Sequence, residues 1–160
     1  MHGLFDVLFE KPDVRKMRQE IQQTPFFQTL SDTEMKKVLR YLQIRSFQKG
    51  QRVFYEGDPG AALFIILRGK VQITRQSKTK RLVLGTLSKG HFFGELALVH
   101  DVPRTASANV SEDAVLVCLF KHDFENIIKH DPVLGTKLLK IINQILSQRL
   151  SAMIERYLNA

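Results

Sequence analysis

One stretch decides how the chain is interpreted: Phe92-Phe-Gly-Glu-Leu-Ala-Leu-Val-His-Asp-Val-Pro-Arg-Thr-Ala-Ser107. Gly94 opens the segment Glu95–Leu98, which predicts a single helical turn, and glycine allows a ligand to approach the backbone closely. The free N–H groups at the start of such a turn favour an anion. Arg104 is expected to point into the fold, where a buried guanidinium requires an anionic partner. That partner is either a phosphate held by the planar guanidinium or the carboxylate of Glu95.

Around this stretch, short apolar segments alternate with Gly or Pro from Ile44 to Phe120. This pattern is typical of an antiparallel β-roll or jelly roll. The turns are predicted at 48–50, 56–60, 68–69 and 88–90, where glycine recurs. Eight strands are predicted, at 44–47, 52–55, 62–67, 71–75, 81–87, 91–93, 106–110 and 115–120.

Helices are predicted on both sides of the roll. Pro12 begins a polar helix over 10–23, and Ser31-Asp-Thr-Glu34 fits a capping box for a helix over 32–42. A short helix over 122–129 precedes a long one from Asp131-Pro132 onward, about 25 residues or roughly 37 Å in length. The fold class is therefore α+β, mainly β. We expect one domain over 1–160, with a helical flank at 1–43, the roll at 44–120 and C-terminal helices at 121–160.

The motifs together resemble the cyclic nucleotide-binding domain family. Phe93-Gly-Glu-Leu-Ala-Leu98, a five-residue gap and Arg104-Thr-Ala106 resemble its phosphate-binding cassette. Gly50-Gln-Arg-Val-Phe-Tyr-Glu-Gly-Asp58, Leu63-Phe-Ile-Ile-Leu-Arg-Gly69 and Leu87-Ser-Lys-Gly90 match family motifs upstream, in the family's order. The resemblance covers about residues 24–150, and it agrees with the order of helices and strands predicted from the sequence pattern.

The resemblance implies a ligand and a site. The ligand is a cyclic purine nucleotide, cAMP or cGMP, and no cofactor is expected. Arg104 is implied to pair with the cyclic phosphate and Glu95 to accept the ribose 2′-hydroxyl, which suits a carboxylate. The other implied ligand-binding residues are Gly94, Leu96, Ala97, Thr105 and Ala106, with Leu84, Gly85 and Phe93 as further candidates. The alternative is a vestigial cassette in which Arg104 pairs with Glu95 and nothing binds.

Other kinds of site are not supported by the sequence. The five histidines are scattered, so no metal site is expected, and no serine stands in a nucleophile elbow. We therefore predict that the chain is not an enzyme. Cys118 is the single cysteine and is expected to be an inert core thiol. Without a signal-like N-terminus or a long apolar run, the chain is expected to be cytoplasmic, with no membrane partner.

The remaining expectations concern partners. The net charge is +8, and no acidic residue stands between Gly60 and Gly94, which fits a solvated basic sheet edge. In transcription factors of the catabolite activator type, a helix-turn-helix domain follows the long helix. The chain stops at Ala160, so no sequence-specific DNA binding is expected, although a basic DNA-associated regulator is a further alternative. We predict a stand-alone sensor that signals through its last helix, either to an unknown protein partner or by forming a homodimer.

Overall fold

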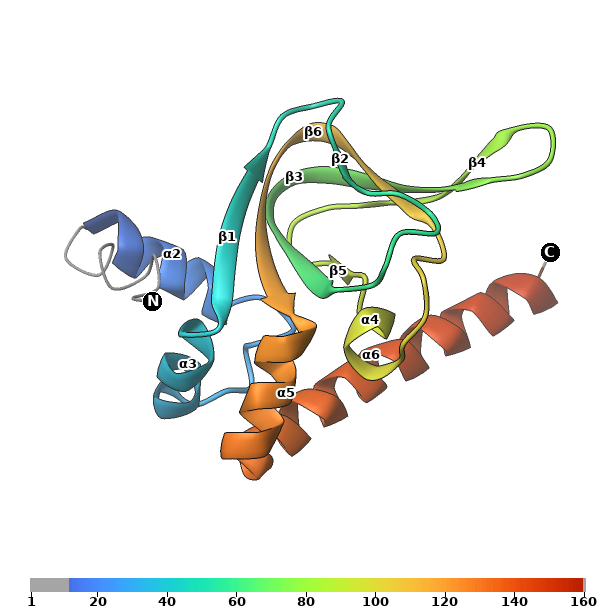
Figure 1. Cartoon of the computed structure of the whole chain (residues 1–160). Coiled ribbons are helices and arrows are strands. Elements are labelled where there is room, and N and C mark those ends of the chain that lie inside the picture. Colours follow the sequence, from blue (N-terminus) through green and yellow to red (C-terminus); the bar gives the residue numbers. More distant parts are fainter. Residues whose placement is uncertain (1–11, 160) are drawn as a thin grey trace. The chain divides into compact units, whose positions relative to one another are not determined.

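The computed structural model describes residues 12–159 and is shown in Figure 1. The chain divides into two compact units, residues 1–124 and 125–160, which are described separately. The predicted order of helices, antiparallel sheet and long C-terminal helix is confirmed. Among the described residues no helix is both long and apolar enough to cross a membrane.

A six-stranded antiparallel sheet forms the body of the first unit. Its main path runs β1-β6-β3-β4, while β2 pairs with β6 and β5 pairs with β3. The bounds are β1 Leu42–Phe47, β2 Arg52–Phe54, β3 Ala62–Gln76, β4 Arg81–Leu87, β5 Phe92–Phe93 and β6 Ser107–Phe120.

The structure has fewer strands than the eight predicted, because β3 and β6 each span two predicted strands. Gly69, predicted to end a strand at a turn, adopts a φ of +82° inside β3. A Cβ at this position would lie 2.1 Å from the Asp113 carbonyl oxygen. Because glycine absorbs the positive φ locally, the ladder with β6 shifts register around Lys70 and then continues.

The sheet encloses an apolar core. Buried residues of this core come mainly from β3 and β6, namely Ala62, Phe64, Ile66, Val71, Phe93, Ala108, Val110, Ala114, Leu116 and Cys118. Cys118 is fully buried, as predicted, and burial raises the pKa of its thiol to about 11. The core therefore fixes the inner face of β3, on which the site described below is built.

Two helices precede the sheet, α2 (Pro12–Gln22) and α3 (Asp32–Leu39). The predicted capping box is confirmed, because the Ser31 N–H donates to Glu34 Oε2 at 2.7 Å and the Glu34 N–H donates to Ser31 Oγ at 3.2 Å. Phe26, between these helices, packs edge-on against Phe92 of β5 with ring centroids 5.2 Å apart. The segment between the helices is thereby anchored to the sheet.

The last two helices are α5 (Lys121–His130) and α6 (Pro132–Leu158). The Asp131 side chain accepts a hydrogen bond from the Leu134 N–H at 3.1 Å, and Pro132 stands in the first turn of α6. Buried residues occur only in the first half of α6, from Leu134 to Ile142. The large apolar residues from position 150 onward, Leu150, Met153, Ile154, Tyr157 and Leu158, are 51–85% exposed.

Candidate functional site

Backbone pairing between the loop at 57–59 and the segment at 103–104 holds Arg104 near the start of β3. The Arg104 N–H donates to the Asp58 carbonyl oxygen, and the Gly57 N–H donates to the Arg104 carbonyl oxygen, both at 2.8 Å. An isolated bridge between Pro59 and Pro103 extends this pairing. The position of Arg104 is thus set by backbone pairing between segments that are far apart in the sequence.

The guanidinium of Arg104 points inward, as predicted, and the residue is 8% exposed. Nη2 donates to the Ala62 carbonyl oxygen at 2.8 Å, and Nη1 donates to the Gly94 carbonyl oxygen at 3.2 Å. The third nitrogen of the guanidinium, Nε, is buried and has no hydrogen-bond partner within the described part of the chain. An unsatisfied buried donor is costly, so Arg104 is prepared for a further acceptor.

Aromatic rings support the same guanidinium. Its central carbon lies 4.1 Å from the ring centroid of Phe54 and 5.6 Å from that of Phe64. Phe93 stacks on Phe64 with centroids 5.4 Å apart, and Phe54 lies 5.9 Å from Phe93. A cation over a ring face is stabilised by the ring quadrupole, so these rings fix the plane of the guanidinium as well as its place.

The charge of Arg104 is only partly balanced. Burial lowers the pKa of Arg104, while the negative charges of Asp58 and Glu95 raise it. A guanidinium stays protonated in proteins, so the site holds a desolvated cation. The carbonyl acceptors supply dipoles but no net charge. An anionic ligand would therefore gain more here than at a solvated arginine.

Glycines make the close approach of these groups possible. Gly94 has a φ of +77°, and a Cβ on it would lie 2.6 Å from Arg104 Nη1 and 3.0 Å from the Ala62 carbonyl oxygen. A Cβ on Gly60 would lie 2.9 Å from the Cβ of Ala97. Both glycines let the cassette pack directly against the loop that precedes β3.

The predicted helical turn is present as α4 (Leu96–Val99), preceded by Glu95. Glu95 is 8% exposed and contributes to the electrostatics of Arg104. The Ala97 N–H donates to the Gly94 carbonyl oxygen at 3.2 Å, so this predicted backbone donor is already used within the turn. The Leu96 side chain is exposed.

The other predicted site residues lie in different environments. Phe93 is buried in the aromatic cluster, Ala106 is buried, and Thr105 is exposed. Leu84 and Gly85 lie on β4, where Leu84 is 58% exposed and no atom lies within 4 Å of a Cβ built on Gly85. The hydrogen bonds and ring contacts of Arg104 involve neither of them.

Phe54 and Asp58 act on Arg104 but were not predicted as site residues. Both stand in the segment Gly50–Asp58, which was identified only as a family motif. The available sequence signal was an aromatic residue, Phe54, four positions before an acidic residue, Asp58. Both lie in a segment that begins with Gly50 and has a second glycine at Gly57. Within the cassette, Asp101 forms an ion pair with Lys121 that lowers the pKa of this carboxyl.

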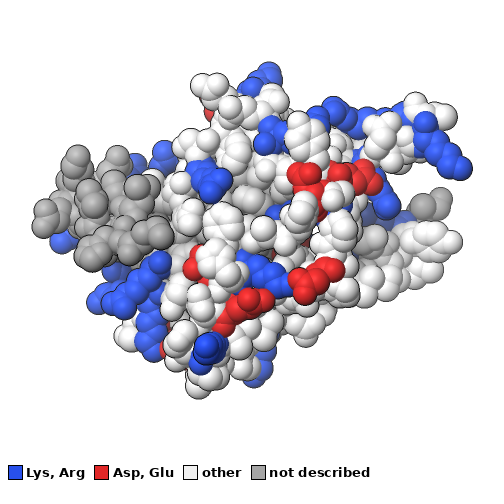
Figure 2. All heavy atoms as spheres, viewed as in Figure 1, with Lys and Arg blue, Asp and Glu red and all other residues white. Residues whose placement is uncertain are grey.

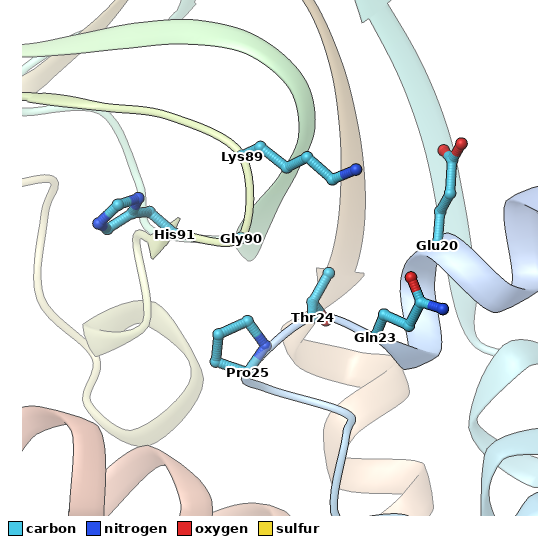
Figure 3. A pocket seen from close by; sticks show the side chains of 7 residues that line it. All are labelled: Glu20, Gln23, Thr24, Pro25, Lys89, Gly90 and His91. Carbon is cyan, nitrogen blue, oxygen red and sulfur yellow. The ribbon is translucent and has the colours of Figure 1, made fainter.

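A cavity lies elsewhere in the first unit, at the end of α2 and the turn between β4 and β5. Its lining residues are Glu20, Gln23, Thr24, Pro25, Lys89, Gly90 and His91 (Figure 3). None of them belongs to the cassette, and Glu20 is already paired with Arg68 at 3.1 Å. In the described range 12–159, no group of three or more His, Cys, Asp or Glu residues could hold a metal ion.

Comparison with known proteins gives the same family. Residues 44–131 match the family described as Cyclic nucleotide-binding domain. The chain is 34% identical over 124 residues to "Cyclic AMP receptor protein" of Thermus thermophilus, covering 74% of this chain and 56% of that protein. It is 34% identical over 99 residues to "cAMP-dependent protein kinase regulatory subunit" of Mycosarcoma maydis, covering 60% and 19%. The chain thus spans about half or less of these two relatives.

A solved structure of similar extent also matches. It is a cyclic nucleotide-binding domain from Methylobacillus flagellatus KT, with a TM-score of 0.82 and 25% identity. The match covers 89% of this chain and 83% of that one. This chain therefore shares the jelly-roll fold of this relative, as the sequence predicted.

Proposed function

Because the chain belongs to the cyclic nucleotide-binding domain family, we propose that its cassette binds a cyclic purine mononucleotide, cAMP or cGMP. Family membership makes the matched region a regulatory binding domain rather than an enzyme, as predicted. The two curated relatives have cyclic AMP in their names, which supports this ligand class. A cytoplasmic location, expected from the sequence, remains part of the proposal.

The observation that carries the proposal is the state of Arg104. Its guanidinium is buried and fixed in plane, and its Nε has no partner among the described residues. A ring phosphate carries one negative charge and offers acceptor oxygens, which would satisfy both the unused donor and the desolvated cation. Glu95, which follows Gly94 in the sequence, is proposed to accept the ribose 2′-hydroxyl. The N–H groups of Leu96 and Ala106 and the Thr105 hydroxyl are proposed to complete the contacts.

Titration calorimetry with cAMP, cGMP and non-cyclic 5′-AMP tests the ligand class. We expect one of the cyclic nucleotides to bind and 5′-AMP to bind more weakly, because its extra charge and open phosphate do not match one guanidinium. Arg104→Ala should lower the affinity about 30- to 1000-fold, since it removes a charge-assisted pair worth roughly 2–4 kcal/mol.

Arg45→Ala is the matched control, because Arg45 also lies over a ring, that of Phe120, but outside the cassette. Its affinity should equal that of the wild type. If wild-type protein binds neither cyclic nucleotide, the vestigial ligand-free interaction module is the correct alternative. If Arg104→Ala binds as tightly as the wild type, the ligand lies elsewhere.

For the output of the domain we propose helix α6. Its second half carries Leu150, Met153, Ile154 and Tyr157, which share one face at helical spacing and are exposed. Such a strip is typical of a surface that a partner or a second copy covers. We propose that signalling runs through this strip, by self-association or by binding another protein.

A further inference from the structure

The hairpin of β3 and β4 is a distinct structural feature of the first unit. The two strands pair as far as Gln76 and Arg81, and the Ser77 N–H donates to the Lys80 carbonyl oxygen at 2.9 Å to close the turn. In Figure 1 the hairpin extends away from the rest of the sheet. Residues 78–84, at its end, are all exposed.

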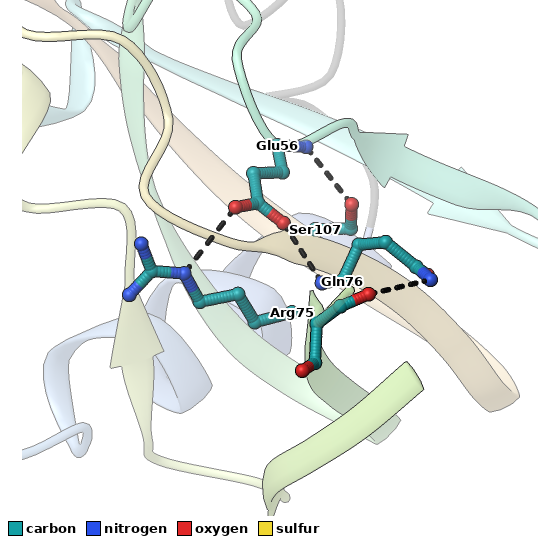
Figure 4. Close-up of polar contacts among 5 residues, drawn as sticks. Glu56, Arg75, Gln76 and Ser107 are labelled. Carbon is teal, nitrogen blue, oxygen red and sulfur yellow. Dashed lines mark hydrogen bonds and ion pairs between the residues drawn. The ribbon is translucent and has the colours of Figure 1, made fainter. Parts of the chain in front are cut away.

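The end of β3, next to the turn of this hairpin, is held in place. The Glu56 carboxylate accepts hydrogen bonds from Arg75 Nε at 3.3 Å and from the Gln76 N–H at 3.0 Å, and the Glu56 N–H donates to the Ser107 hydroxyl (Figure 4). These contacts tie the strands to the loop after β2 and to β6. The turn at 77–80 and the start of β4 thus follow a fixed strand end, and Arg75 is already neutralised.

The turn after β3 and the start of β4 are basic and unneutralised. Lys78, Lys80 and Arg81 are exposed. Within residues 12–159, no ion pair involves any of them, in contrast to Lys70, which pairs with Glu112 at 3.0 Å. Figure 2 shows Lys and Arg gathered in this region, at the upper right of the molecule. Three adjacent cations without counter-charges favour an anionic surface.

Aliphatic side chains follow these cations directly. Leu82, Val83 and Leu84 are 38%, 56% and 58% exposed. In the ladder, Ile73 pairs with Gly85 while the next residue, Thr74, pairs with Val83, so Leu84 is the extra residue of a β-bulge. In a regular strand every second side chain would point inward, and the bulge interrupts this alternation. Three consecutive exposed aliphatic residues are unusual on a water-exposed strand.

We propose that residues 78–84 of the hairpin dock on a membrane surface that contains anionic phospholipid. The Lys78, Lys80 and Arg81 side chains contact headgroup phosphates, and Leu82–Leu84 enter the boundary between headgroups and acyl chains. Basic groups beside a small apolar patch are the combination that binds such a surface. Leu84 is also one of the further ligand candidates, and the inference is therefore tested in the absence of nucleotide.

The alternative partners fit the hairpin less well. A nucleic acid would neutralise the cations but leave the aliphatic side chains in water. A second copy would bring two basic hairpins together in a chain whose net charge is +8. The sequence predicted no membrane partner, because it contains no long apolar run. The exposure of Leu82–Leu84 changes that expectation.

Vesicle co-sedimentation of the full chain tests the proposal. Vesicles of phosphatidylcholine are compared with vesicles that also contain phosphatidylserine, at low and high salt. We expect binding only to the anionic vesicles, weakened by salt. Lys78→Glu/Lys80→Glu should lower the partitioning at least about 25-fold, since each basic residue contributes about fivefold. Val83→Ser/Leu84→Ser should lower it about tenfold without changing the net charge.

Lys36→Glu/Lys49→Glu is the matched control, because both lysines are exposed and lie on α3 and on the turn after β1. It makes the same charge change and should retain most of the binding. The proposal is wrong if vesicles do not bind, if this control loses as much as the hairpin variant, or if the Val83/Leu84 variant binds like the wild type. Binding of a DNA duplex in place of vesicles would also overturn it. Circular dichroism and thermal melting check that all variants fold.

Discussion

The central guanidinium carbon of Arg104 lies 4.1 Å above the ring of Phe54, although the two residues are fifty positions apart in the chain. Phe54 is the last residue of β2, a short strand that pairs with β6. The ring thus holds the cation from one side, while carbonyl oxygens of Ala62 and Gly94 hold its terminal nitrogens. We therefore regard Phe54 as a positioning residue for the proposed phosphate contact.

Phe54→Leu should weaken cyclic nucleotide binding about 3- to 30-fold, because it keeps an apolar side chain but removes the ring quadrupole under a desolvated cation. Calorimetry measures the affinity, and thermal melting measures the change in stability. Phe54→Tyr keeps the ring and should bind like the wild type. If Phe54→Leu melts at a lower temperature but binds with unchanged affinity, Phe54 has only a packing role.

Gly94→Ala should abolish tight binding. A Cβ there would lie 2.6 Å from Arg104 Nη1, and the backbone φ of +77° costs a side-chain-bearing residue about 1–2 kcal/mol. Gly50→Ala separates the two effects, because Gly50 has a φ of +89° but no atom within 4 Å of the added Cβ. Both variants should lose stability in thermal melts. Only Gly94→Ala should lose affinity in calorimetry, and equal affinities for the two would contradict the role assigned to Gly94.

Local sequence signals predicted much of the fold. The strand predicted at 81–87 has the bounds of β4, the capping box at Ser31 is present, and the long last helix begins at Pro132. The predicted breaks inside β3 and β6 were wrong. In β3, Gly69 at positive φ forms an irregularity within a paired strand instead of a turn. In β6, which has no glycine, Glu112 pairs with Lys70 and joins the two predicted strands. Only the pairing partner decides between these outcomes, and it is not visible in the local sequence.

The sequence named side chains for the candidate site but did not predict their contacts. Arg104 and Glu95 were named from the cassette pattern, and both are buried. The hydrogen-bond acceptors of Arg104 include the backbone carbonyls of Ala62 and Gly94, which no residue pattern encodes. Phe54 contributes a ring face from a distant strand, so its role depends on sheet topology. The ligand contacts of the cassette and the single-domain organisation over 1–160 stay predictions.

Cys118 should make folding stability pH-dependent in alkaline solution. Burial raises the pKa of its thiol from the ordinary 9.0 to about 11. The unfolded chain therefore releases this proton at lower pH than the folded chain, so stability is unaffected below about pH 9 and falls as the pH rises from about 9 to 11. Urea unfolding of the wild type and of Cys118→Ala across this range measures the difference. The difference between the unfolding free energies of the wild type and of Cys118→Ala should narrow as the pH rises. A constant difference would contradict the raised pKa.

The exposed strip on α6 should mediate self-association. Leu150, Met153 and Tyr157 lie on one face, so pairing with a second copy would remove their apolar surface from water. Static light scattering should then give a dimer mass for the wild type at high micromolar concentration. Leu150→Glu/Met153→Glu should give the 18.4 kDa monomer, because two carboxylates would be buried at the seam. Gln144→Glu/Gln148→Glu adds the same charge at exposed polar positions on a different face of α6 and should remain dimeric. A wild-type protein that stays monomeric with and without cAMP would contradict self-association through this strip.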